Sequence, residues 1–432
     1  MIARLVFLLT LACAAPAMAQ SIYGCVGLDD TNGLPSVEGD NGVFYRVNPD
    51  LRMFHAVSDE SVARLAGLSK ALADLGTTLV YVPLPTKGLA MPDQLPQAAH
   101  DYGFDVVLAT TVYEDILKRL AEAGVVTADI RRALRAGADG PPSIFPTDYR
   151  LTAAGAQRAA AAIAAAMTGT AGFKDLQKGR FASSITGKET LPSDMRASLQ
   201  RHCQITLPEL LVDTYANTRL QGDAVAGDNT LLGTTAISSR VAVVGTEHVG
   251  TASSNFAGAL SAASGLDVQQ YTVDGGGSFA AISSYLTSRA FQDQRPAYLV
   301  WINPVENNLA QFGDQPLREL TAAAGGNCRV PLPSGPGGVA NSVSADLTAL
   351  DRTQTYTLFL DAEGTQATSA QFDFQSALGL TRTRTVQRNP GQVATGRFYM
   401  PMSGLWPEGT LSVTITLNAP VANIARVTAC FD

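Results

Sequence analysis

The chain has 432 residues, of which 46% are hydrophobic and 16% are charged. This balance is typical of a globular protein rather than a disordered one, and the length favours two domains over one small core. The net charge of −7 argues against the broad basic surface that nucleic-acid binding requires. Nucleic acid is therefore not an expected partner.

Residues 1–19 have the order of a secretory signal peptide. Arg4 supplies a basic region, residues 5–12 an apolar region, and residues 17–19 an A-x-A cleavage site. The apolar run is too short to cross a bilayer, and no later run reaches the roughly 18 apolar residues that a span needs. We expect an exported protein with no membrane span.

Export changes the interpretation of the cysteines. Four of them follow the signal peptide, namely Cys25, Cys203, Cys328 and Cys430. An even number in an oxidising compartment predicts two disulfides, and sequence alone leaves three pairings open. The spacing favours Cys25–Cys203 and Cys328–Cys430, because the second bond would join the two ends of a C-terminal module.

Residues 41–309 alternate between strand and helix patterns. Strands are predicted at residues 76–83, 105–108, 240–245 and 298–302, and helices at residues 62–75, 112–124 and 153–167. Thr152 is a suitable N-cap for the last helix. Continuous apolar strands that alternate with helices indicate a parallel sheet covered on both faces. The predicted fold class of residues 20–325 is therefore α/β.

The pattern changes after Gly325 and Gly326. Residues 331–341 are rich in Pro, Gly and Ser, and period-two alternation follows at residues 355–360, 396–400 and 410–417. This alternation indicates antiparallel strands, and no helix pattern accompanies it. We predict a second domain at residues 328–432, a small antiparallel β-sandwich.

Two loops are candidates for the functional site, because functional groups gather at the carboxyl ends of parallel strands. The first covers residues 145–152, and the second, residues 245–250, directly follows a buried-type strand. The glycine run at residues 275–277 lacks the Gly-Lys-Ser/Thr of a phosphate loop and is interpreted as a strand-to-helix connection. No histidine is spaced like a metal ligand, so we predict neither a cofactor nor a metal.

Several motifs, in their order along the chain, resemble the AlgX/AlgJ family of alginate O-acetylation proteins. They are Gly42-Val43-Phe44-Tyr45-Arg46, Val80-Tyr81-Val82-Pro83 with Pro85 and Lys87, Val243-Val244-Gly245-Thr246, Gly275-Gly276-Gly277 with Phe279, and Trp301-Ile302-Asn303-Pro304. The resemblance implies an SGNH hydrolase-like domain followed by a carbohydrate-binding module, with one disulfide in each domain. It also implies a periplasmic protein that works on an exopolysaccharide, within an export or acetylation complex.

The catalytic positions differ from the family pattern. The family has Thr-Asp-x-His-Trp in the first loop, where this chain keeps Asp148 but has Arg150 in the histidine position. The family nucleophile is the first serine of Gly-Thr-Ser-Tyr-Ser, and here Glu247 takes its place, followed by His248. A protonated arginine accepts no proton, and glutamate attack on an acetyl donor gives a mixed anhydride instead of a stable ester. We therefore predict a catalytically degenerate member.

The two replacements carry opposite charges. We hypothesise that Glu247 and Arg150 form a salt bridge that fills the vacated site, with Asp148 as a second partner of the guanidinium. The motivation is a paired change at two positions that meet in the family fold.

Two other functions remain open on the same residues. His248 as base, or Ser253 or Ser254 as nucleophile, would give an active O-acetyltransferase with displaced residues. Asp148 and Glu247 as a carboxylate pair would give a secreted polysaccharide hydrolase.

The C-terminal module carries a local basic signal. Residues 374–407 contain no acidic residue but four arginines, with two aromatic residues close by. The candidate carbohydrate-binding residues are Arg382, Arg384, Arg388, Arg397, Tyr399 and Trp406. Arginine forks suit carboxylates and aromatic faces suit sugar rings, which favours an anionic polysaccharide such as alginate as partner. The alternative is a set of solvated arginines on a strand face.

Overall fold

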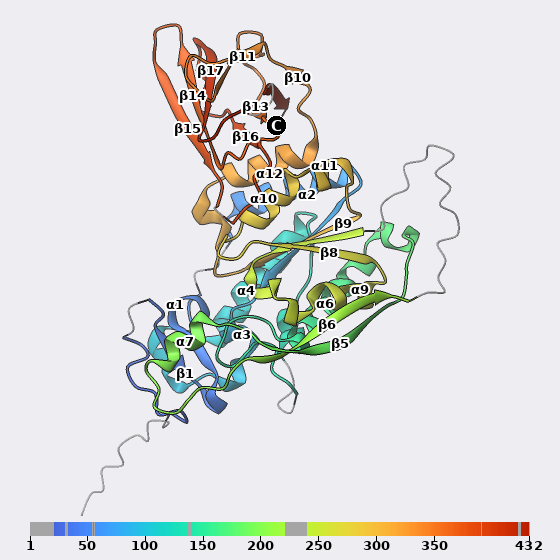
Figure 1. Ribbon diagram of the computed structural model, residues 1–432, viewed down its shortest axis with the longest axis vertical. Coiled ribbons are helices and arrows are strands. Elements are labelled where there is room, and N and C mark those ends of the chain that lie inside the picture. Colours follow the sequence, from blue (N-terminus) through green and yellow to red (C-terminus); the bar gives the residue numbers. More distant parts are fainter. Residues whose placement is uncertain are drawn as a thin grey trace, which may run out of the picture.

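A computed structural model describes residues 21–30, 33–53, 55, 57–135, 140–220, 240–389, 391–421 and 425–431. The predicted signal peptide, residues 1–19, lies outside the described residues. Figure 1 shows an α/β part below, coloured blue to yellow, and a β-rich part above it, coloured orange to red. In the described part of the chain, no helix is long and apolar enough to cross a membrane.

The centre of the α/β part is a five-stranded sheet in which every neighbouring pair is parallel. Its strands, in spatial order, are β4 (Val126–Thr127), β3 (Thr78–Leu84), β9 (Tyr298–Pro304), β7 (Arg240–Gly245) and β8 (Asp267–Thr272). Every residue of the central strand β9 is buried. Continuous burial requires cover on both faces, so the predicted α/β class is confirmed.

Helices cover both faces of this sheet. One face is covered by α6 (Ala153–Thr168) and α9 (Phe256–Ser264), and the other by α2 (Asp59–Ala73), α10 (Ala280–Leu286) and α12 (Gln315–Gly325). The Thr152 side chain accepts a hydrogen bond from the Gly155 N–H at 3.1 Å, which confirms the predicted N-cap of α6. Short helices complete this part: α1 (Val47–Asp50), α3 (Lys87–Ala90), α5 (Arg131–Leu134), α7 (Asp194–Gln200), α8 (Glu247–Gly250) and α11 (Arg289–Asp293).

One local prediction is wrong, and one pair of strands was not predicted. Residues 105–108 are not a strand, because Asp105 caps α4 (Val106–Glu122) by accepting a hydrogen bond from the Leu108 N–H at 2.8 Å. The sequence also gave no indication of the antiparallel ribbon of β5 (Phe181–Thr190) and β6 (Leu211–Arg219). Most β5 residues are exposed, so the ribbon lacks the hydrophobic alternation that identifies a strand. A second small pair joins β1 (Ser36–Glu38) to β2 (Phe44–Arg46).

The β-rich part is a sandwich of two antiparallel sheets around one apolar core. One sheet contains β10 (Val330–Pro331), β18 (Arg426–Phe431), β13 (Tyr356–Asp361) and β16 (Arg397–Pro401). The other contains β11 (Ser334–Pro336), β12 (Ser342–Asp346), β17 (Thr410–Leu417), β14 (Ser369–Ser376) and β15 (Thr381–Gln387). The predicted β-sandwich is confirmed, and its four-stranded sheet packs against α12.

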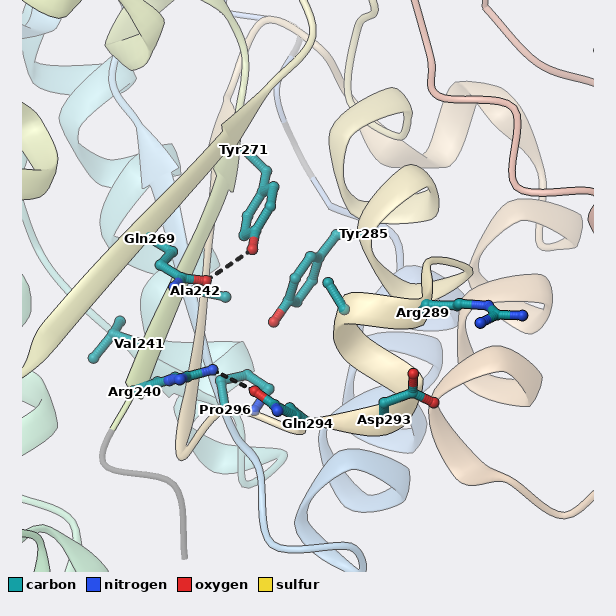
Figure 2. A pocket seen from close by; sticks show the side chains of 11 residues that line it. Arg240, Val241, Ala242, Gln269, Tyr271, Tyr285, Arg289, Asp293, Gln294 and Pro296 are labelled. Atoms are coloured by element: carbon teal, nitrogen blue, oxygen red, sulfur yellow. Dashed lines mark hydrogen bonds between the residues drawn. The ribbon is translucent and has the colours of Figure 1, made fainter.

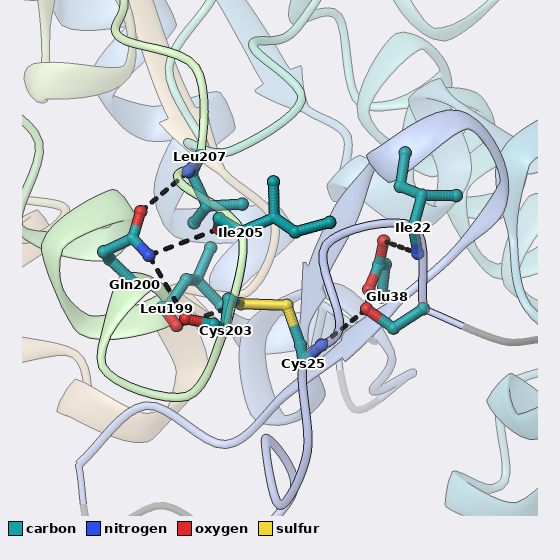
Figure 3. The surroundings of a disulfide bond; sticks show 9 residues. Ile22, Cys25, Glu38, Leu199, Gln200, Cys203, Ile205 and Leu207 are labelled. Carbon is teal, nitrogen blue, oxygen red and sulfur yellow. Dashed lines mark hydrogen bonds between the residues drawn. A yellow bond between two sulfur atoms is a disulfide. The ribbon is translucent and has the colours of Figure 1, made fainter.

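Both expected disulfides are present, Cys25–Cys203 and Cys328–Cys430. The first ties the N-terminal segment to the loop after α7, and Figure 3 shows Gln200 organising that loop. The Gln200 side chain accepts a hydrogen bond from the Leu207 N–H at 2.7 Å and donates to the Ile205 carbonyl at 3.3 Å. The second disulfide joins residues 102 positions apart at the two ends of the sandwich.

Candidate functional site

The structure brings the two candidate loops together at the carboxyl end of β7. The Leu151 N–H donates to the carbonyl of His248 at 3.0 Å. The rings of Tyr149 and His248 lie 4.8 Å apart, inclined by 54°. The loop at residues 145–152 therefore packs directly on α8, which begins at Glu247.

Lys87, at the start of α3, fixes the first loop from below. Its ammonium donates to the carbonyl oxygens of Phe145 at 2.7 Å, Pro146 at 2.8 Å and Asp148 at 2.9 Å. Three acceptors match the three protons of an ammonium group. Burial lowers the pKa of Lys87 to about 7, against the raising effect of the Asp50 and Asp148 charges. The lysine thus serves the backbone of the loop and presents nothing to solvent.

Asp148 and Arg150 form a closed pair within the first loop. The Arg150 guanidinium donates to Asp148 Oδ1 at 2.9 Å and to Oδ2 at 2.7 Å, and it also donates to the Pro192 carbonyl at 2.6 Å. Burial raises the pKa of Asp148, but hydrogen bonds from Arg150 and Ser193 outweigh it and hold that pKa below its ordinary value. The predicted contact between Asp148 and the guanidinium is confirmed.

Glu247 has a different partner from the predicted one. Its carboxylate accepts a hydrogen bond from the Gly275 N–H at 3.1 Å. Among the described residues, no ion pair within 4.0 Å joins Glu247 to Arg150, so the hypothesised salt bridge is wrong. The physical reason is local. Asp148 lies two residues from Arg150 and is only 1% exposed, and its two carboxylate oxygens accept hydrogen bonds from the Arg150 guanidinium.

His248 belongs to a buried network of polar side chains. Its Nδ1 lies 2.8 Å from the Thr246 hydroxyl, and its Nε2 lies 3.5 Å from a carboxylate oxygen of Glu306. Arg46 approaches the same Glu306 oxygen at 3.3 Å and donates to both carboxylate oxygens of Asp50, at 3.0 and 2.9 Å. Sequence analysis missed Glu306 and Asp50, although the four-residue spacing of Arg46 and Asp50 was a detectable signal.

The charged side chains of this network lie next to partners of opposite charge. Burial raises the pKa of Glu306, but the His248 ring 3.5 Å away and the Arg46 charge outweigh it and lower that pKa. The Arg46 guanidinium also lies 4.4 Å from the centre of the Tyr149 ring. The void between these side chains is about 10 Å³, room for about one water molecule and not for an acetyl group or a sugar ring.

Ser253 and Ser254, the serines proposed as displaced nucleophiles, do not belong to this polar network. The Ser254 hydroxyl donates to the carbonyls of Val249 at 3.1 Å and Thr251 at 2.8 Å. Ser253 is buried, and the turn that carries it packs against α6 and β6. Both serines therefore contribute to packing around α8.

The glycine run at residues 275–277 connects β8 to α10, as interpreted from the sequence. Gly275 and Gly277 have positive φ angles of 64° and 63°, which favour glycine. The Gly275 carbonyl accepts a hydrogen bond from the Asn389 amide at 3.3 Å. The connection therefore links Glu247 to the β-sandwich.

A crevice opens between the two parts beside this connection. It has a volume of about 390 Å³ and is lined by the β8–α10 connection, α12 and the end of β15. The rings of Phe279 and Phe312, both in its lining, lie 5.4 Å apart. Thr385, Gln387 and Asn389 provide hydroxyl and amide groups on the sandwich side. This lining of aromatic and neutral polar groups suits a sugar chain.

Two of the predicted carbohydrate-binding residues, Arg388 and Tyr399, are buried in the structure, and a third, Arg397, is partly buried. Arg388 is 9% exposed, and its guanidinium binds Glu319 of α12 and the Arg397 carbonyl. Arg397 donates to the Thr287 carbonyl at 3.2 Å, and the Tyr399 ring stacks on Phe359 at 4.5 Å. These side chains join the two parts, so the prediction that they face a polymer is wrong. Sequence spacing could not show that β16 packs on α12.

The other three predicted residues lie nearer the surface. Arg382 and Arg384 are exposed on β15, an edge strand of the sandwich. Trp406 is half-buried, with the Arg352 guanidinium 4.8 Å from its ring centre. Arg382 and Arg384 thus remain available to a ligand.

A second recess, of about 310 Å³, lies at the other end of the sheet (Figure 2). It is lined by Arg240, the first residue of β7, and by the facing rings of Tyr271 and Tyr285. Because Glu247 follows the opposite end of β7, this recess is separate from the candidate loops.

Comparisons with known proteins agree with this architecture. The family described as "SGNH hydrolase-like domain, acetyltransferase AlgX" matches residues 37–304. The alginate biosynthesis protein AlgX of Pseudomonas aeruginosa is 30% identical over 275 residues, covering 64% of this chain and 56% of that protein. The probable alginate O-acetylase AlgJ of the same organism is 26% identical over 282 residues, covering 62% of this chain and 70% of that protein.

Solved structures show the same fold. The structure of Pseudomonas aeruginosa AlgX covers 92% of this chain and 94% of its own, with a TM-score of 0.74 and 22% identity. The O-acetyltransferase domain of Pseudomonas putida AlgJ covers 66% of this chain and 98% of its own, with a TM-score of 0.51 and 22% identity. In sequence, the chain spans about half the length of the AlgX relatives it matches.

Proposed function

Because the chain belongs to the family of SGNH hydrolase-like AlgX acetyltransferase domains, we propose that it is a polymer-binding protein of exopolysaccharide biosynthesis without the family's serine chemistry. Its place is the periplasm, in agreement with the signal-peptide pattern and the two disulfides. The substrate class is an anionic, alginate-like polysaccharide. The protein takes part in O-acetylation or export as a member of a periplasmic complex.

One observation carries the proposal: Arg150 and Glu247 occupy the two catalytic positions, and both side chains are engaged in hydrogen bonds. Arg150 is held by both oxygens of Asp148 and cannot accept a proton. Glu247 accepts a backbone hydrogen bond from Gly275 and offers no hydroxyl for a stable acyl ester.

Polymer binding is supported by the open surface next to these loops. The crevice of about 390 Å³ carries Phe279 and Phe312, and β15 continues from it toward Arg384 and Arg382. An aromatic pair stacks on sugar rings, and guanidinium groups pair with uronate carboxylates. We propose that the crevice and the exposed arginines of β15 contact different sugar units of the same polymer.

Calorimetric titration with polymannuronate oligomers tests polymer binding. The mature wild-type protein should bind, and Arg382→Ala/Arg384→Ala should weaken binding about fivefold to tenfold, because exposed charge pairs contribute modestly. Arg132→Ala is the matched control, since its side chain is 75% exposed on the α/β part, far from β15. Absence of wild-type binding, or equal losses in both variants, would contradict the proposal.

A second function, acetyl transfer, has one observation in its favour. The 2.8 Å contact between the Thr246 hydroxyl and His248 Nδ1, with Glu306 on the other ring nitrogen, has the order of a nucleophile, a base and an orienting carboxylate. Thr246 and His248 are only 4% and 8% exposed, which disfavours this function. Acetyl release that disappears in both Thr246→Ala and His248→Ala would establish it.

A further inference from the structure

The hairpin that joins β14 to β15 exposes leucines at its tip. Leu378 is 87% exposed and Leu380 is 69% exposed. The Ala377 N–H donates to the Gly409 carbonyl at 3.1 Å, which places the tip beside the start of β17, where Leu411 is 41% exposed. Single exposed leucines are common on protein surfaces, but a group at one point indicates a contact site.

Hydrogen bonds fix the conformation of the hairpin tip. The Ser376 N–H donates to the Leu380 carbonyl at 2.9 Å, and the Gly379 N–H donates to the Ser376 carbonyl at 3.0 Å. The Ser376 hydroxyl accepts a third hydrogen bond from the Leu380 N–H at 3.1 Å. Gly379 has a φ angle of 76°, a conformation that favours glycine. The turn therefore holds both leucines outward in a fixed geometry.

Positive charge follows the leucines along β15. Arg382 and Arg384 are exposed, and neither has an ion-pair partner among the described residues. No Asp or Glu occurs between residues 374 and 407, although the whole protein has a net charge of −7. The nearest carboxylate is that of Asp373 on β14, opposite Thr383, and it accepts hydrogen bonds from the Thr383 hydroxyl at 2.5 Å and the Gln371 amide at 2.9 Å.

The acidic residues of the neighbouring loops are engaged locally. Asp346 accepts hydrogen bonds from the N–H and hydroxyl of Thr348, at 2.8 and 2.6 Å. Asp351 does the same for Thr353, at 2.9 and 2.8 Å. These carboxylates cap their own turns and do not pair with Arg382 or Arg384.

From this arrangement we propose that the β14–β15 hairpin docks on a bilayer surface that carries anionic phospholipid headgroups. Leu378 and Leu380 enter the boundary between headgroups and acyl chains, and Arg382 and Arg384 bind the phosphates above them. Apolar insertion combined with attraction to anionic lipids is the established physical basis of peripheral membrane binding.

Size and position favour a bilayer over a folded protein partner. A stable protein interface buries about 800 Å² on each side, which a few leucines at a hairpin tip do not supply. A bilayer needs no matching shape, and two inserted side chains with nearby cations suffice for reversible binding. Figure 1 places β14 and β15 at one extremity of the molecule, opposite α1, β1 and α7, so the hairpin can meet a flat surface without a clash.

Vesicle flotation with the mature protein tests this proposal. Vesicles of phosphatidylcholine alone are compared with vesicles that also contain phosphatidylglycerol. Wild-type protein should float with the anionic vesicles, and Leu378→Ser/Leu380→Ser should reduce the bound fraction at least about tenfold. The matched control is Ile185→Ser/Leu211→Ser, because these residues are 61% and 63% exposed on the β5–β6 ribbon. The control should bind as the wild type does.

A second variant reports insertion directly. Leu378→Trp should show a blue shift of tryptophan emission when anionic vesicles are added, and none with phosphatidylcholine alone. The proposal is overturned if wild-type protein does not float, if the control loses as much as the tip variant, or if the tip variant abolishes self-association of the chain instead. Polymannuronate binding is measured on the same variants. It should survive Leu378→Ser/Leu380→Ser, so that failure of membrane docking is distinguishable from failure of polymer binding.

Discussion

Two regions at the carboxyl edge of the SGNH-like sheet have opposite character. Around His248 the charged side chains of Arg46, Asp50 and Glu306 pair with one another, and the void that these residues line has a volume of about 10 Å³. The crevice beside it, between the sheet domain and the sandwich, has about 390 Å³ and an aromatic and amide lining. In the first region charged side chains pair around a space too small for a ligand, whereas the second region is large enough to admit one. The difference agrees with the proposed function, in which the crevice binds the polymer and the catalytic corner contributes to stability.

The largest expected effect comes from breaking the filled region. Asp50→Ala leaves the buried Arg46 guanidinium without its bidentate partner. We expect a loss of about 3–5 kcal/mol in the free energy of unfolding, because an unpaired buried charge is strongly destabilising. Urea unfolding at pH 7 measures it.

Asp74→Ala is the matched control, because it removes a salt bridge to Lys70 whose partners are 60% and 74% exposed. Its effect should stay below about 1 kcal/mol. Similar losses in both variants would show that the Arg46 network contributes no more than a surface pair.

The next effect concerns the junction between the two regions. Glu319→Ala removes the carboxylate that binds the buried Arg388 guanidinium across the domain interface. We expect a loss of about 2–4 kcal/mol, together with separate unfolding of the sandwich in calorimetry, because the pair is desolvated. A single unchanged transition would mean that the interface does not depend on this pair.

A smaller effect is the acid dependence of the filled region. Since the folded pKa of Asp148 lies below its unfolded value, the unfolded state binds more protons between the two values and stability rises with pH there. The contribution is present above about pH 4 and is lost as pH falls through the folded pKa. The stability difference between wild type and Asp148→Asn should therefore be larger at pH 7 than at pH 3. An equal difference at both values would contradict the assignment.

The smallest effect on stability is expected in the open region. Arg382→Ala/Arg384→Ala should change the free energy of unfolding by less than about 0.5 kcal/mol, because exposed side chains without partners contribute little. Under the proposed function the same variant should weaken polymer binding, which would separate a binding role from a folding role. A loss of stability comparable to that of Asp50→Ala would instead assign these arginines to the structure.

The sequence was a good guide wherever local pattern decides the structure. The continuous apolar strands at 240–245 and 298–302 and the capped alanine helix after Thr152 are confirmed, because burial on both sides leaves one pattern. The exposed β5–β6 ribbon was missed, since it has no buried face to create alternation. Residues 105–108 were misassigned because the three apolar residues after Asp105 suit a strand and a helix start equally.

The site was predicted as two meeting loops, but not in its pairings. Glu247 and Arg150 carry opposite charges, yet Asp148 is closer to Arg150 along the chain and lies in a fixed turn, so it takes the guanidinium. Arg388 and Arg397 appear as a basic patch in sequence, whereas tertiary packing against α12 buries Arg388 and packing against Thr287 partly buries Arg397. Such competition between possible partners depends on geometry that spacing does not specify.

We propose that the site occupied by Arg150 and Glu247 performs no acyl transfer. The most direct test is acetyl release from a chromogenic acetyl ester by the mature protein, with and without polymannuronate, beside Glu247→Ser/Arg150→His. We expect no turnover by the wild type under either condition. The double variant should gain acetyl-release activity, because it restores a serine and a histidine next to Asp148. Turnover by the wild type that is abolished by Thr246→Ala or His248→Ala would contradict it.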